Sequence, residues 1–340
     1  MQRSSAASAT LPITVVIPTY NRHALILDAI RSVSNQSRKP AELIVVDDGS
    51  TDDTTKVLRA AGLSALKQDR GGIAAARNRG ISAATQPWIA FLDDDDLWQP
   101  SKLERQWDAV QAWPQAGFIF SDMTFFDAAG TRERSLFASR PDYWKLEREV
   151  TVPHIAFFRC RTLTDTLCGF ADNFMMPSTL LIRKDLLLAT AMFDVSLRGL
   201  ETRELLMRLL ATSDAAAVEE PLVRYRLHDE QWVRDVGRNL QSFAAIVDLV
   251  CQHPERYPDA VVRSLQPERA RRHYFAGRYF IRARRFGDAA SSLRRSLDCG
   301  FSGAALLWYL FAGALASRAG NAAFNGLRAL KWRFSKRHMS

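Results

Sequence analysis

Four consecutive aspartates, Asp93 to Asp96, are the residues of this chain with the clearest capacity for chemistry. They directly follow an apolar run, Trp88 to Leu92, which is typical of a buried strand. Like charges this close repel by about 1 kcal/mol per pair even in water, so a compensating charge is expected. Divalent cations prefer carboxylate oxygens, and alternate residues at a strand end point to the same side. The run therefore predicts a metal or ligand site that uses Asp93 and Asp95.

A helix N-terminus that favours acidic side chains is the alternative explanation of this run. The helix expected next has its own start signal, because Ser101 and Glu104 form a capping-box pattern. Capping therefore explains the four aspartates less well than metal binding does. A second acidic pair, Asp47-Asp48, follows another apolar run, and taken alone the sequence Asp-Asp-Gly-Ser predicts only a turn.

The elements that must position these residues alternate short β-branched runs with helical stretches. This alternation predicts an α/β fold, in which crossover helices flank a mostly parallel central sheet. In such sheets ligands bind at the carboxyl ends of the strands, so the residues that follow successive strands should line one edge. The expected strands are residues 13–17, 43–46, 88–92, 117–126, 178–182 and 223–227, with helices at 73–84 and 204–211.

The edge predicted in this way would carry an aromatic ring, carboxylates, a cation and a metal ion. These groups suit the base, the ribose and the diphosphate of a nucleotide. The sequence contains neither GxGxxG nor GxxxxGK[ST], so Arg77 and the metal are expected to bind the phosphates. It also lacks GxSxG, which disfavours a serine hydrolase.

Four segments in this order resemble the motifs of family 2 glycosyltransferases. They are Val15–Arg22, Val45–Asp52, Ala76–Gly80 and Phe91–Asp96. The resemblance implies a GT-A fold and a nucleotide-sugar donor, with a UDP-sugar favoured. It also implies inversion at the anomeric carbon, assistance by Mn²⁺ or Mg²⁺, and a hydroxyl of a glycan or lipid-linked acceptor. The setting it suggests is the assembly of a surface polysaccharide.

The same resemblance implies roles for individual residues. Pro18 and Tyr20 would line the nucleoside pocket, and Asp48 would bind the base. Arg77 would approach the nucleotide and Asp94 would lie near the ribose. The implied metal site consists of Asp95, with Asp93 adjacent and His228 joining the metal and diphosphate shell.

Inversion in a single displacement also needs a base that takes the proton of the attacking hydroxyl. Relatives commonly use the Asp of a Glu-Asp pair that opens a helix, but here the pair reads Glu201-Thr202. A threonine hydroxyl has no useful basicity, so Glu201 is the nearest substitute, or Glu204 if the register differs by one turn. If both only complement the helix dipole, the chain is a catalytically weak or inactive sugar-nucleotide-binding or scaffold protein.

Composition divides the 340 residues into a catalytic domain at 11–235 and a helical, basic region at 240–340. Residues 241–340 contain 17 Lys and Arg against 6 Asp and Glu, whereas the rest of the chain is nearly neutral. Such a region suits an anionic lipid surface as readily as a nucleic acid. No nucleic acid is expected as a partner, because the aromatic residues of this region have the helical spacing of a packed core.

Within the basic region, residues 269–301 resemble one tetratricopeptide-type hairpin, with two packed amphipathic helices as the simpler interpretation. Residues 321–340 carry apolar side chains on one helical face among basic ones, which suits an anionic membrane surface or docking on the protein itself. The apolar stretch 304–316 is shorter than the roughly 20 residues needed to cross a bilayer. With no secretory signal at the N-terminus, the catalytic part is expected in the cytoplasm, at or near the inner face of the cell membrane.

Overall fold

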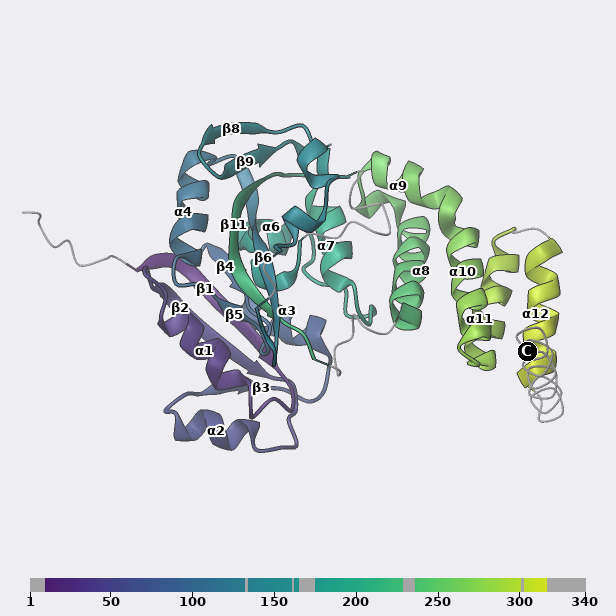
Figure 1. Ribbon diagram of the computed structural model, residues 1–340, viewed down its shortest axis with the longest axis horizontal. Helices are drawn as coiled ribbons and strands as arrows, with labels where there is room; N and C mark the ends of the chain where they lie inside the picture. The colour runs from purple at the N-terminus through teal and green to yellow at the C-terminus, as the bar shows by residue number, and fades with distance from the viewer. Residues whose placement is uncertain are drawn as a thin grey trace, which may run out of the picture. The chain divides into compact units, whose positions relative to one another are not determined.

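A mixed sheet of eleven strands organises the first part of the computed structural model, which describes residues 10–131, 134–160, 162–164, 175–228, 236–300 and 303–316 (Figure 1). The order along the sheet is β3-β2-β1-β4-β10-β6-β11-β9-β8, with β5 paired to β11 and β7 paired to β6. The strands are β1 (Leu11–Thr19), β2 (Pro40–Asp47), β3 (Ala65–Lys67), β4 (Trp88–Phe91), β5 (Leu97–Trp98), β6 (Ala116–Asp127), β7 (Gly130–Thr131), β8 (Glu149–Val152), β9 (Ile155–Phe158), β10 (Leu181–Arg183) and β11 (Asp214–Arg226).

The register of β1 brings the expected strand ends together. β1 is parallel to β2, with Thr19 opposite Asp47, and parallel to β4, with Val16 opposite Phe91. Because β1 is buried on both faces, its apolar run continues without polar alternation, as expected for a central parallel strand. The prediction that the ends of these three strands share one edge is confirmed.

Helix α3 (Ile73–Ala83) packs on β1 and β2 and carries Arg77 toward that edge. Gly80 makes the close packing feasible, since a Cβ at this position would lie 2.3 Å from Val16 Cγ1. The other helices of this part are α1 (Ile26–Ser34), α2 (Thr54–Ala60), α4 (Lys102–Ala112), α6 (Lys184–Ala189) and α7 (Glu201–Leu209).

The structure corrects two local predictions. Ser101 precedes α4 but makes no side-chain capping bond, and Glu104 instead accepts a hydrogen bond from Ser37 Oγ at 2.6 Å, so the capping box is not formed. Strand β5 separates the acidic run from α4, so the run does not lie at that helix end. The expected strand at 178–182 is shortened to β10, because residues Pro177–Thr179 form a 3-10 turn.

The chain divides into two compact units, one of Met1–Gln231 with Glu255–Val261 and the other of Trp232–Pro254 with Val262–Ser340. The division begins near the expected boundary, but a short later segment returns to the first unit. Helix α9 (Asp259–Leu265) lies where the chain leaves the first unit again.

The second unit is helical in the part of it that the structure describes. It contains α8 (Val236–Gln252), α10 (Arg269–Arg282), α11 (Phe286–Asp298) and α12 (Gly303–Ala316). α10 and α11 form the expected pair of packed amphipathic helices, with Phe280, Ala289 and Leu293 in their core. The turn between them lies at 283–285. No helix in the described ranges has the length and apolar character needed to cross a bilayer, and the expected amphipathic segment 321–340 lies outside them.

Lys102 is a fully buried lysine in the first turn of α4. Its Nζ donates a hydrogen bond to Gln106 Oε1 at 2.6 Å and lies 4.0 Å from the centroid of the Trp98 ring. No carboxylate partner accompanies it among the described residues, and burial lowers the pKa of its ammonium group well below the usual 10.5. The folded protein therefore disfavours the charged form of the Lys102 side chain.

Lys102→Met should therefore stabilise the protein by about 1–3 kcal/mol near neutral pH, since an apolar side chain avoids desolvating a charge. Because the folded pKa is depressed, the cost of Lys102 grows as the pH falls below about 10.5. The gain in unfolding free energy should thus be larger at neutral pH than at about pH 10, as measured by urea unfolding followed by tryptophan fluorescence. The exposed Lys56→Met serves as the control, and a gain that is equal at both pH values would contradict the assignment.

Candidate functional site

A buried guanidinium links three elements at the carboxyl edge of the sheet. Arg77 on α3 is 1% exposed; its NH2 donates to Asp93 Oδ1 at 2.7 Å, just after β4, and its NH1 donates to Glu201 Oε1 at 2.5 Å, at the start of α7. Burial alone would lower the pKa of Arg77, but Asp93 and Glu201 raise it above the usual value. Arg77 was expected to approach the phosphates; in the structure it is buried and binds these two carboxylates.

The four aspartates of the acidic run have different surroundings. Asp96 is fully buried, where Oδ2 accepts a hydrogen bond from Ser178 Oγ at 2.6 Å and Oδ1 accepts one from the Arg226 N–H at 3.1 Å. Burial raises the pKa of Asp93 and Asp96, and burial together with the neighbouring Asp95 raises the pKa of Asp94 to about 7. Asp96 therefore fastens the end of β11 to the run, while the side chains of Asp93, Asp94 and Asp95 are 22%, 13% and 17% exposed.

The side chains of Asp95 and His228 are in contact and bring a carboxylate oxygen next to an imidazole nitrogen. His228 Nε2 lies 2.9 Å from Asp95 Oδ2, and the two side chains are 21% and 17% exposed. Asp93, the third expected metal ligand, is bound by Arg77. The described residues hold no group of three His, Cys, Asp or Glu side chains arranged for a metal ion, so the expected three-ligand cluster is not formed. The carboxylate oxygen and imidazole nitrogen still fit a divalent cation whose remaining ligands come from elsewhere.

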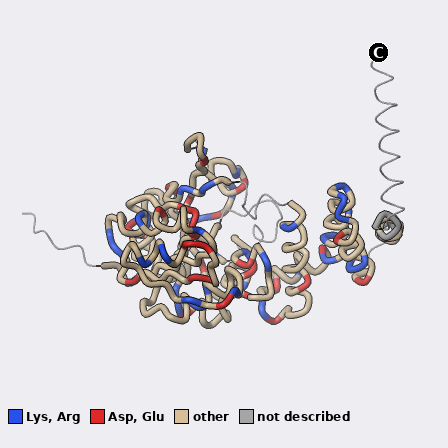
Figure 2. Tube along the Cα trace, turned by 90° about the horizontal axis from the view of Figure 1, so that it is seen from below, with Lys and Arg blue, Asp and Glu red and all other residues tan. Residues whose placement is uncertain are grey.

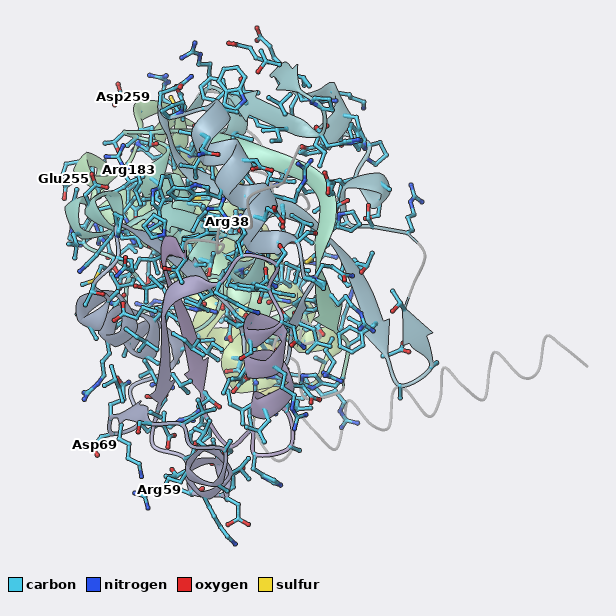
Figure 3. All side chains as sticks on the ribbon, turned by 90° about the vertical axis from the view of Figure 1, so that its left-hand side faces the viewer. Arg38, Arg59, Asp69, Arg183, Glu255 and Asp259 are labelled. Carbon is cyan, nitrogen blue, oxygen red and sulfur yellow. The ribbon has the colours of Figure 1, made fainter. Side chains whose placement is uncertain are left out.

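Asp48, at the end of β2, shapes the loop that precedes α3. Its carboxylate accepts hydrogen bonds from Gly71 N–H at 2.7 Å, Gly72 N–H at 2.9 Å and Gln68 Nε2 at 2.7 Å. This loop includes Asp69, which is labelled in Figure 3. Asp48 was expected to bind a base; in the structure its two oxygens are used to fix the loop.

The same loop places Arg70 over the ring of Tyr20. The guanidinium carbon lies 3.0 Å from the ring centroid, and Arg70 is exposed with no carboxylate partner among the described residues. Gly49, at φ +78°, allows the Arg70 backbone to approach closely. Pro18, two residues before Tyr20, is buried within β1. Sequence analysis did not single out Arg70; its signal is a basic residue in a glycine-rich turn at this edge.

The two candidate bases on α7, Glu201 and Glu204, have different surroundings. Glu204 is fully buried, and its carboxylate accepts hydrogen bonds from Arg208 Nε at 2.7 Å, Arg208 NH2 at 2.6 Å and Tyr257 Oη at 2.6 Å. It is therefore a packing residue and not a base. Glu201 is 8% exposed and has the Arg77 contact described above. Thr202 lies beside it, with Oγ1 3.4 Å from Arg77 NH1.

Part of this chain is similar to a family of enzymes. Residues 14–171 match the model described as glycosyl transferase family 2. An uncharacterised glycosyltransferase of Rickettsia typhi is 25% identical over 236 residues, covering 69% of this chain and 70% of the relative. TuaG of Bacillus subtilis, which its name assigns to teichuronic acid biosynthesis, is 37% identical over 125 residues, covering 35% of this chain and 49% of TuaG. The chain thus spans about half of TuaG.

Two solved structures share the fold at low sequence identity. S. aureus TarS 1–349 in complex with UDP-GlcNAc has a TM-score of 0.58 at 17% identity, covering 85% of this chain and 81% of that one. The mannosyltransferase PcManGT of Pyrobaculum calidifontis, in complex with GDP-Man and Mn²⁺, has a TM-score of 0.54 at 18% identity. The match covers 93% of this chain and 85% of PcManGT. These likenesses confirm the expected GT-A fold with a helical C-terminal region.

Replacing Asp48 by Asn should loosen the loop before α3. An amide cannot accept all three hydrogen bonds, so one backbone N–H loses its partner at a cost of about 1–3 kcal/mol in unfolding free energy. Amide hydrogen exchange at Gly71 and Gly72 should become faster than in the parent. Asp53→Asn is the matched control, because Asp53 is exposed and makes no side-chain capping bond to α2. Unchanged exchange in the Asp48 variant would show that the loop does not depend on this carboxylate.

Proposed function

Since residues 14–171 belong to glycosyl transferase family 2, we propose that this chain transfers one sugar, with inversion, from a UDP-sugar to a hydroxyl of a glycan or lipid-linked acceptor. The observation that carries the proposal is the register of β1, β2 and β4. It supports a nucleotide site at one edge, where an aromatic ring follows β1, an exposed cation lies in the loop after β3, and the acidic run follows β4. TuaG supports a setting in surface polysaccharide assembly, which we assign to the cytoplasmic side of the cell membrane.

The proposed metal ligands are Asp95 and His228. They offer the oxygen and nitrogen donors that a divalent cation accepts, and the surrounding carboxylates favour a positive charge. When bound, Mn²⁺ or Mg²⁺ would neutralise charge that develops on the leaving diphosphate. We assign Asp93 to a supporting role, because its carboxylate is held by Arg77. Asp94 remains the proposed neighbour of the ribose.

The proposed nucleotide contacts are Tyr20 and Arg70. An aromatic ring at a strand end is a stacking surface for a base, and a guanidinium can stack on a base or bind a phosphate. Arg70 is exposed and lies over Tyr20, whereas Arg77 is buried between two carboxylates. We therefore assign to Arg70 the nucleotide contact that the sequence suggested for Arg77.

The proposed base is Glu201. Arg77 occupies its Oε1, which leaves Oε2 as the oxygen that would take the proton from the attacking hydroxyl. The same guanidinium holds Asp93 on its other side, so it fixes the spacing between the proposed base and the acidic run. A catalytic group held at a fixed distance needs less reorganisation when the reaction occurs.

Nucleotide binding tests the site without knowledge of the acceptor. Calorimetric titration of UDP and UDP-sugars, with and without Mn²⁺, should show binding that Mn²⁺ strengthens. Asp95→Ala should abolish only the Mn²⁺-dependent part. Arg70→Ala should weaken binding about tenfold under both conditions, as expected for the loss of one charge-assisted contact.

Asp69→Ala is the matched control for Arg70, since it changes an exposed charge in the same loop. A Mn²⁺ effect that persists in the Asp95 variant would move the cation site elsewhere. Failure to bind any nucleotide, with the fold intact, would refute the proposed function.

Transfer itself tests Glu201. Release of UDP from a UDP-sugar, with water as the acceptor, should fall by about 10²–10⁴ in Glu201→Gln, while UDP affinity stays near that of the parent. Adding Thr202→Asp to this variant should restore part of the rate, because the new carboxylate lies beside Arg77.

If Glu201→Gln released UDP as fast as the parent, Glu201 would be excluded as the base. The catalytically inactive sugar-nucleotide binder predicts a different result, in which the parent binds UDP-sugar with Mn²⁺ but releases no UDP. The threonine at position 202, where relatives commonly have an aspartate, is the observation that supports this second candidate.

A further inference from the structure

Helix α12 presents a continuous apolar stripe to solvent. Leu306, Leu307, Leu310 and Phe311 are 41% to 71% exposed. At 100° per residue these four positions fall within an arc of about 140° on one side of the helix. On the other side Ala312 is fully buried, and Trp308 and Tyr309 pack against the core of α10 and α11. We call the four exposed residues the α12 apolar face.

The sequence around this face is basic and free of acidic residues. After Asp298 the chain contains no Asp or Glu, and six Lys and Arg follow α12. On the neighbouring helix, the Arg278 guanidinium lies 5.4 Å from the Trp308 ring centroid. Figure 2 marks further basic residues along the helices of the second unit. An exposed apolar patch within a basic unit is typical of a surface that binds an anionic membrane.

We propose that the α12 apolar face inserts into the surface of an anionic lipid bilayer. The helix has 14 residues and is too short to span, so it would lie in the plane of the interface. Its leucines and phenylalanine would enter the acyl boundary, while arginines of the neighbouring helix, Arg278 among them, bind lipid phosphates. A second copy of the chain fits less well, because it would bring two strongly basic units together. The inference is independent of the proposed transfer reaction.

Vesicle flotation with the full chain tests this surface. The parent should float with phosphatidylcholine vesicles that contain about one-third phosphatidylglycerol, and stay unbound with phosphatidylcholine alone. Leu307→Gln combined with Leu310→Gln should reduce recovery with the anionic vesicles about tenfold, because it removes apolar area without changing charge. Val195→Gln, at an exposed apolar position in the first unit, is the matched control and should float like the parent.

Three results would overturn the proposal. The parent could remain unbound with both vesicles, or the double variant could float as well as the parent, which would place binding elsewhere. The parent could also sediment as a dimer that the double variant converts to a monomer, which would assign the face to self-association. UDP release measured without vesicles should be equal in all variants, so a failure of the lipid proposal is distinguishable from a failure of the proposed function.

Discussion

The buried guanidinium of Arg77 is the interaction on which the site depends. It joins a helix, a strand end and a second helix whose sequence positions are 16 and 124 residues away from it. A buried guanidinium without partners would strongly destabilise the fold, and here Asp93 and Glu201 each bind a different nitrogen of the planar group. Lysine could not do this, since its ammonium is a single point charge without a fork. Gly80 contributes indirectly, because it lets α3 lie close enough to β1 for Arg77 to reach both partners.

A second constraint follows from the acidic run. Three of its carboxyl groups have raised pKa values because the site is buried and Asp95 adds like charge to each of them. Arg77 relieves this strain on one side and His228 contacts Asp95 on the other. The carboxyl groups of the acidic run are thus crowded together at one edge of the sheet. Clustered groups with perturbed pKa values are typical of functional sites.

The sequence was sufficient to predict what depends on local pattern. The acidic run after Leu92 and the buried run of β1 placed the correct strand ends at one edge, and the pattern of residues 269–301 indicated a pair of packed amphipathic helices. The side-chain partners of the site residues could not be predicted from the sequence. Glu201 and Glu204 are one helical turn apart, and only packing decides that the first meets Arg77 and the second meets Arg208 and Tyr257. Likewise, nothing local indicates that Asp48 binds two glycine amides, or that Arg70 covers Tyr20.

The segment Glu255–Val261 belongs to the first unit, so this unit consists of two separate stretches of the sequence. Its Tyr257 hydroxyl reaches Glu204 on the helix that begins with Glu201, and its Arg256 binds Asp194 at 3.2 Å just before that helix. Helix α8 is therefore an excursion between two pieces of one folded body. A chain cut near residue 235 would therefore lose part of its first unit, including the Tyr257 hydroxyl that binds Glu204.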